Sequence, residues 1–217
     1  MNHAEALAAY IRLHTEFVLV ASMEGSYGHM GATLTDAVLQ AGVNYETVVR
    51  PRVERVLGTY PDATTTSSFA RLIRQLGADQ VLSWQGNRKL RTLQELISVL
   101  LQNGVETEDQ LRIWLEKPAN LERIRQIKGI KDKTAHYLQI LVGAQGVAID
   151  RHLFRFLEEA GTPTNSYDEA HKLICDAATL LGVDWSVLDY SIWRYMSQRA
   201  SGVSTKHCGG QGSPPNG

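Results

Sequence analysis

Lys133 and Asp150 are the two residues of this chain whose types and spacing suggest chemistry. Lys133 lies four residues after Gly129, and Asp150 lies seventeen residues after Lys133, in the stretch IKGIKDKTAHYLQILVGAQGVAID. Lysine amines act as nucleophiles, and aspartate carboxylates act as acids, bases and electrostatic stabilisers. Whether the amine and the carboxylate act together depends on the elements that position them.

The segment 121–138 (LERIRQIKGIKDKTAHYL) is typical of two helices joined by a tight turn. Gly129 permits the sharp turn, because glycine adopts backbone conformations that other residues avoid. The free N–H groups at the start of the second helix predict an anion site that accepts a phosphate, and Lys128, Lys131 and Lys133 crowd the same turn. The alternative interpretation is an ordinary helical hairpin with solvated lysines.

This turn resembles the helix-hairpin-helix of the HhH-GPD superfamily of DNA glycosylases, which includes endonuclease III, 8-oxoguanine glycosylase and adenine glycosylase. The family hairpin reads approximately L-P-G-V-G-x-K-T-A. Gly129, the apolar Ile130 and the run Lys133-Thr134-Ala135 match this pattern. Lys128 and Lys131 stand where the family has its proline and its second glycine.

The segment after the second helix resembles the same family. IDRHLFR (149–155) is similar to the family segment V-D-T-H-V-x-R, with Arg151 in place of the threonine. Gly161 stands where the family often ends this helix. The resemblance covers roughly residues 30–200, and its specific motifs lie in 121–161.

The resemblance implies a role for each of the two residues. Lys133 would attack the anomeric carbon of a damaged nucleotide and form a Schiff base, as in a bifunctional glycosylase with AP lyase activity. Asp150 would stabilise the positive charge that develops on the sugar and act as acid–base partner. Two alternatives remain: a glycosylase without a lyase step, in which Lys133 contacts phosphate, and a non-catalytic DNA-binding module. Without the motif, Asp150 would be interpreted as a helix N-cap.

The resemblance also implies which residues contact DNA. Gly129, Ile130 and Lys131 belong to the hairpin that would bind the phosphate backbone. Two further contacts come from Asn87 and Lys89, in a segment (Gly86 to Lys89) similar to the family's G-x-x-N-x-K-A.

A side chain must also fill the gap left by an extruded base. Gln40 is the candidate, in a segment (38–63) that resembles the family's first DNA-facing helix-turn, and Asn44 is the alternative.

Helical periodicity predicts an all-α fold, with two helical lobes flanking a cleft and a helix-hairpin-helix motif. Besides the hairpin, helices are expected over 4–14, 33–42, 44–58, 67–77, 87–104, 107–117, 132–143, 150–161, 166–182 and 184–201. Thr33 is the expected cap of the second helix, Pro51 predicts a kink or boundary, and Thr107 opens a capping box with Gln110. FVLVAS (17–22) is the only candidate strand, and it could equally end the first helix.

The resemblance places the domain boundaries. Residues 1–200 would form the glycosylase core, with one lobe at approximately 30–145 and the other made of 1–29 and 146–200. Residues 201–217 are rich in Gly, Ser and Pro, and we expect them to be a disordered tail.

Composition restricts the partners and cofactors. The formal net charge of -1 argues against a purely electrostatic nucleic-acid binder. Two cysteines, Cys175 and Cys208, cannot supply the four ligands of the iron–sulfur cluster of endonuclease III, so no cluster and no other cofactor is expected.

Localisation follows from the absence of a signal-peptide pattern and of a long apolar run. We expect a monomeric protein without a membrane partner, cytoplasmic or nucleoid-associated if prokaryotic. Its partner would be double-stranded DNA with a damaged base or abasic site.

Overall fold

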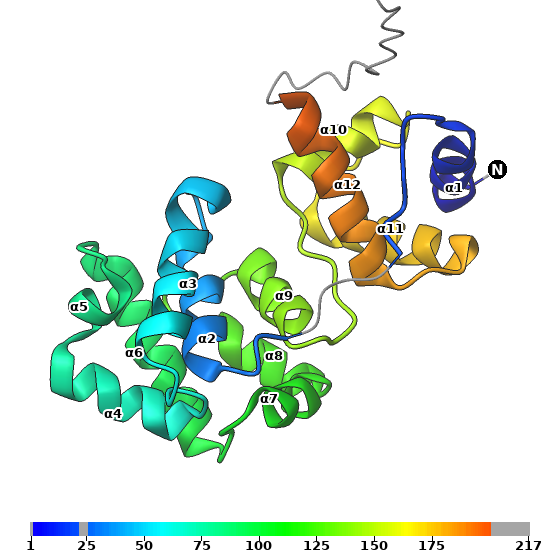
Figure 1. Cartoon of the computed structure of the whole chain (residues 1–217). Coiled ribbons are helices and arrows are strands. Elements are labelled where there is room, and N and C mark those ends of the chain that lie inside the picture. The colour runs from blue at the N-terminus through cyan, green and yellow to red at the C-terminus, as the bar shows by residue number, and fades with distance from the viewer. Residues whose placement is uncertain (1, 22–25, 201–217) are drawn as a thin grey trace, which may run out of the picture.

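The computed structural model describes residues 2–21 and 26–200, and every regular element within these ranges is a helix. The predicted all-α fold is therefore confirmed (Figure 1). The elements are α1 (His3–Leu13), α2 (Met30–Leu39), the π-helical turn η1 (Tyr45–Val49), α3 (Arg50–Thr59), α4 (Thr66–Leu76), α5 (Ala78–Leu82), α6 (Asn87–Gln102), α7 (Glu108–Leu115), α8 (Pro118–Arg125), α9 (Asp132–Leu141), α10 (Arg151–Glu159), α11 (Tyr167–Leu181) and α12 (Trp185–Ala200).

Local capping chemistry explains where several helices begin. Thr107 accepts a hydrogen bond from the Gln110 amide, and the Gln110 side chain accepts one from the Thr107 amide, so the predicted capping box is present. The expected break near Pro51 is also present, because η1 ends at Val49 and α3 starts at Arg50 with the proline in its first turn. Proline is tolerated there since first-turn amides have no helical partner.

Other predicted boundaries differ from the structure. Thr33 does not cap α2; the helix begins three residues earlier, capped by His29, whose Nδ1 accepts from the Ala32 amide at 3.0 Å. The histidine Nε2 lies 2.9 Å from the Tyr60 carbonyl oxygen, and this contact orients the ring for capping. The candidate strand at 17–22 is not a strand within its described residues, and it does not extend α1, which ends at Leu13.

The buried apolar side chains form two clusters. One cluster takes its members from α2 to α9, between Met30 and Val142. The other takes its members from α1 and Phe17 together with 147–196, which includes α10, α11 and α12. Figure 1 shows these two groups of helices with the segment after α9 running between them. Lys133 and Asp150 therefore come from helices that belong to different clusters.

Among the described residues, every helix is too short or too polar to cross a bilayer. The tail expected at 201–217 lies outside the described residues.

Candidate functional site

Lys133 lies in the first turn of α9, directly after a tight turn at Gly129. Gly129 has a φ of +103°, and an added Cβ there would lie 2.4 Å from Thr92 Oγ1 of α6. Both facts require glycine. The N-cap of α9 is Lys131, whose side chain makes no capping hydrogen bond, so no side chain of the turn covers the first amides of the helix.

Asp150 is the N-cap of α10. Its Oδ1 accepts hydrogen bonds from the amides of His152 at 2.8 Å and Leu153 at 3.3 Å. These bonds hold the carboxylate at the positive end of the helix, which favours a negative charge. The second oxygen, Oδ2, is thereby left to face Lys133.

The amine and the carboxylate meet. Lys133 Nζ lies 3.4 Å from Asp150 Oδ2, and the two side chains are 36% and 12% exposed. The carboxylate is therefore largely screened from water, while the amine keeps access to solvent. An amine in this setting can approach a bound electrophile without leaving its carboxylate partner.

A third ionisable group lies close to this pair. Asp189 of α12 is buried, and its carboxylate accepts a hydrogen bond from the Ala148 amide at 3.1 Å. Burial raises the pKa of Asp189 to about 7; the Ala148 hydrogen bond lowers this pKa, the negative charge of Asp150 raises it and the positive charge of Lys133 lowers it. The sequence-based prediction missed Asp189. The available signal was a carboxylate on the apolar face of a helix, between Leu188 and Ile192.

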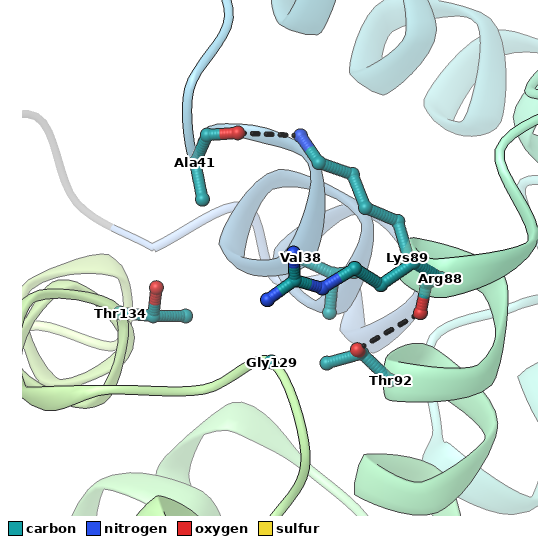
Figure 2. A pocket seen from close by; sticks show the side chains of 7 residues that line it. All are labelled: Val38, Ala41, Arg88, Lys89, Thr92, Gly129 and Thr134. Carbon is teal, nitrogen blue, oxygen red and sulfur yellow. Dashed lines mark hydrogen bonds between the residues drawn. The ribbon is translucent and has the colours of Figure 1, made fainter.

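Two adjoining hollows flank the turn before α9. The smaller, of about 180 Å³, is lined by Val38, Ala41, Arg88, Lys89, Thr92, Gly129 and Thr134 (Figure 2). Figure 2 shows the Arg88 side chain extending between α2 and the turn. The larger, of about 450 Å³, is lined by Ala41, Arg88, Arg125 to Lys131, Lys133 and Thr134.

The larger hollow is basic. Five cationic side chains line it and no acidic residue does, although the whole chain carries a net charge of -1. Arg125 is committed to ion pairs with Glu122 and Asp132 at 3.4 and 2.9 Å. The other four cations are Arg88, Lys128, Lys131 and Lys133. Among the residues that the structure describes, only Lys133 of these four pairs with a carboxylate, that of Asp150, which does not line the hollow.

The hairpin residues predicted to contact DNA lie at this hollow. Gly129, Ile130 and Lys131 all line it, together with Lys133. The Ile130 side chain is buried in the first apolar cluster, so this residue offers backbone groups only. The Lys131 side chain is exposed.

The other residues predicted to contact DNA are Gln40, Lys89 and Asn87, and they do not line the larger hollow. Gln40 is buried, and its Nε2 lies 3.4 Å from Thr134 Oγ1. Lys89 donates hydrogen bonds to the carbonyls of Leu39 and, at 2.7 Å, Ala41, so it caps the C-terminus of α2. Burial lowers the pKa of Lys89. Asn87 is exposed at the start of α6 and lines neither hollow.

A buried carboxylate among tyrosines was also missed by the sequence-based prediction. Asp36 of α2 is fully buried; its Oδ2 accepts from Tyr27 at 2.7 Å and from Tyr45 at 3.4 Å, and its Oδ1 accepts from Tyr137 at 3.2 Å. Burial raises the pKa of Asp36 to about 6 against the lowering effect of the three hydroxyls. Asp36 lies one helical turn before Gln40, and Tyr137 lies one turn after Lys133.

A polar network joins α8, α9 and α11 beside the site. His136 has one ring nitrogen 3.0 Å from the Arg125 guanidinium and the other 2.7 Å from the Tyr167 hydroxyl. Burial, then His171 and Arg125, lower the pKa of His136 to about 3, so the ring is neutral near pH 7. Within the described ranges, no group of three or more His, Cys, Asp or Glu side chains is arranged to hold a metal ion.

Among known protein families, the model of a domain of unknown function, DUF8548, matches residues 5–197. The match spans both apolar clusters and contains Lys133, Asp150 and Asp189. The chain therefore belongs to the DUF8548 family.

Proposed function

We propose that this protein is a base-excision DNA N-glycosylase with AP lyase activity. Lys133 is the nucleophile and Asp150 its electrostatic partner. The observation that carries the proposal is the 3.4 Å contact between Lys133 Nζ and Asp150 Oδ2, made by a lysine side chain that is 36% exposed and a carboxylate side chain that is 12% exposed.

The first step is the release of the base. The neutral amine of Lys133 attacks the anomeric carbon, the new N–C bond replaces the glycosidic bond, and the base leaves with the bonding electrons and takes up a proton. Positive charge develops on the sugar in the transition state. Asp150 stabilises this charge, because its carboxylate is fixed by two amides of α10 and is only 12% exposed.

The second step is strand cleavage. The sugar ring opens as the bond between the anomeric carbon and the ring oxygen breaks, and the oxygen leaves with the bonding electrons and takes up a proton. The nitrogen bound to the anomeric carbon loses a proton and forms the C=N bond of a Schiff base. Loss of a proton from the neighbouring carbon then eliminates the 3′ phosphate. Asp150 is the carboxylate beside the amine that can accept and return protons.

The basic hollow supports a DNA substrate. Arg88, Lys128 and Lys131 line it without an acidic neighbour in the lining, and the first amides of α9 are not capped by a side chain of the turn. Cationic side chains and helix-start amides are the groups that bind phosphate.

A non-catalytic DNA-binding module is the second candidate. It is favoured by one observation: Asp150 does not line the hollow that carries the phosphate-binding groups. Such a module binds duplex DNA, never releases a base and forms no covalent adduct.

Borohydride trapping separates the two candidates. The wild-type protein is incubated with duplex DNA containing an abasic site or a damaged base, and borohydride reduces any Schiff base to a stable adduct. We expect an adduct with the wild type and none with Lys133→Gln. Lys131→Gln removes the same charge from the same turn, and we expect it to form the adduct at protein concentrations that saturate its weaker duplex binding. An adduct that persists in Lys133→Gln contradicts the assignment of the nucleophile.

Duplexes with different lesions identify the substrate. The panel carries an oxidised pyrimidine, 8-oxoguanine, an alkylated purine, uracil or mismatched thymine, and base release is measured separately from strand nicking. Release without nicking supports a glycosylase that lacks the lyase step. Duplex binding without release or adduct on any lesion supports the DNA-binding module.

A further inference from the structure

Asp189 connects α12 to the backbone that leads into Asp150. Its side chain is 8% exposed, and its Oδ1 accepts a hydrogen bond from the Ala148 amide at 3.1 Å. Ala148 precedes Asp150 by two residues, in the segment between α9 and α10. The flanking Val147 and Ile149 are buried in the second apolar cluster. The carboxylate therefore helps to fix the segment from which Asp150 extends.

Charged and titratable groups from three other elements interact with Asp189. Lys133 of α9 and Asp150 at the start of α10 act on its carboxyl, and, in addition to burial, the negative charge of Asp189 in turn raises the pKa of Tyr167 and of Cys175 in α11. Lys133 is the cation that acts on Asp189, and Asp150 is a second carboxylate with the same partner. Burial raises the pKa of Asp189 to about 7, so its charge changes near neutral pH.

We propose that Asp189 is a positioning residue for the Lys133–Asp150 pair: its carboxyl holds the backbone before Asp150 and so keeps the Asp150 carboxylate in contact with the Lys133 amine. The inference rests on the proposed function, because it concerns the same amine and carboxylate.

Two substitutions of Asp189 test the anchor. In Asp189→Asn the side chain keeps an oxygen that accepts from the Ala148 amide, whereas Asp189→Ala removes this acceptor. Asp176→Asn is the matched control, because it removes a carboxylate from α11 that is 47% exposed and paired with Lys172.

The experiment measures the rate of borohydride-trapped adduct formation on abasic duplex from pH 5.5 to 9, with the melting temperature of each variant recorded. We expect Asp189→Asn and Asp176→Asn to retain most of the wild-type rate across this range. If Asp189→Ala folds, its rate falls on the order of tenfold at every pH, because the Asp150 segment loses its anchor.

The outcomes distinguish this inference from the proposed function. A wild type that forms no adduct at any pH overturns the proposed function and the inference with it. A wild type that forms the adduct, with a folded Asp189→Ala that forms it at the wild-type rate, overturns the inference alone. A folded Asp189→Asn that forms no adduct also overturns the inference, since asparagine should still position Asp150.

Discussion

The Thr92 hydroxyl of α6 lies 2.8 Å from the Lys128 carbonyl oxygen, at the turn that brings Lys133 into α9. The same hydroxyl is the atom that a Cβ on Gly129 would meet at 2.4 Å. α6 therefore packs against the turn so closely that the residue after Lys128 must lack a side chain. The position of Lys133 depends on this contact, since four residues separate it from Gly129.

Gly129→Ala should therefore destabilise the fold. Its φ of +103° and the contact with Thr92 together predict a loss of about 3 kcal/mol in the free energy of unfolding. Gly104→Ala is the control, because Gly104 also has a positive φ but meets no atom within 4 Å, and we expect a loss of about 1 kcal/mol. Urea denaturation measures both values. Equal losses would show that the contact with Thr92 is unimportant.

Substitutions of Asp150 should separate capping from chemistry. Asp150→Asn keeps a side-chain acceptor for the α10 amides and should lower the free energy of unfolding by less than about 0.5 kcal/mol, whereas Asp150→Ala should lower it by about 1–2 kcal/mol. Both should slow adduct formation by roughly a hundredfold, because each removes the charge beside Lys133. Denaturation and borohydride trapping provide the two measurements.

Ser166→Ala is the matched control for Asp150. Ser166 caps α11 and accepts from the Glu169 amide, so its loss should destabilise the protein by about 1 kcal/mol without slowing adduct formation. A trapping rate that follows stability across all three variants would mean that Asp150 acts only as a cap.

Arg88 and Lys131 should account for part of the salt dependence of DNA binding. Arg88→Gln or Lys131→Gln should weaken duplex binding and reduce the slope of log affinity against log salt concentration by about 1, because each cation replaces one counterion at a phosphate. Fluorescence anisotropy over a range of salt concentrations measures the slope. An unchanged slope in both variants would exclude the basic hollow as the DNA contact.

Lys89→Met should behave differently from these two variants. The Lys89 amine donates to two carbonyls at the end of α2, and removing it leaves these acceptors unpaired. We expect a loss of about 1–3 kcal/mol in stability and an unchanged salt slope. A reduced slope with normal stability would support the phosphate contact that the sequence predicts for Lys89.

Asp36 should make stability depend on pH. Burial raises its folded-state pKa to about 6, above the value of about 4 in an unfolded chain. Between these values the folded protein holds the proton more tightly, so the free energy of unfolding decreases as pH rises from about 4 to about 6 and levels off above that.

Asp36→Asn should remove this contribution, which is about 2–3 kcal/mol for a shift of this size. The difference in unfolding free energy between wild type and variant, measured from pH 4 to 8, should follow the titration of one group. Asp62→Asn, at an exposed position, is the control. A difference that stays constant over the whole range would contradict the raised pKa.

The sequence predicted local features best. Capping residues at Thr107 and Asp150 and the proline at 51 locate helix boundaries within one or two residues, because each acts on amides or carbonyls close to it in the chain. His29 was missed as the cap of α2, since its side chain is oriented by the carbonyl of Tyr60, 31 residues away. The short helix α5 was missed as well, because five residues carry little periodicity.

The candidate site was only partly predictable for the same reason. Lys133 and Asp150 stand out through a motif, but their 3.4 Å contact depends on the path of the segment between α9 and α10. No local sequence motif marks Asp189 or Asp36 as a site residue, because the groups that surround each carboxylate come from residues far away in the chain. The DNA contacts expected of Gln40 and Lys89 stay predictions. Nothing in periodicity shows that Gln40 lies 3.4 Å from Thr134, or that the Lys89 amine donates to the Ala41 carbonyl while Lys89 lines the smaller hollow.

The two apolar clusters have a consequence for the amine and the carboxylate. α9 is anchored in one cluster through Ala135 and Leu138, and α10 in the other through Leu153 and Phe156. A small rotation of one cluster against the other would change the Nζ–Oδ2 separation directly, with no rearrangement inside either cluster. The Nζ–Oδ2 distance therefore depends on the relative orientation of the two clusters. A ligand that contacts both clusters would change this distance and, through it, the reactivity of the amine.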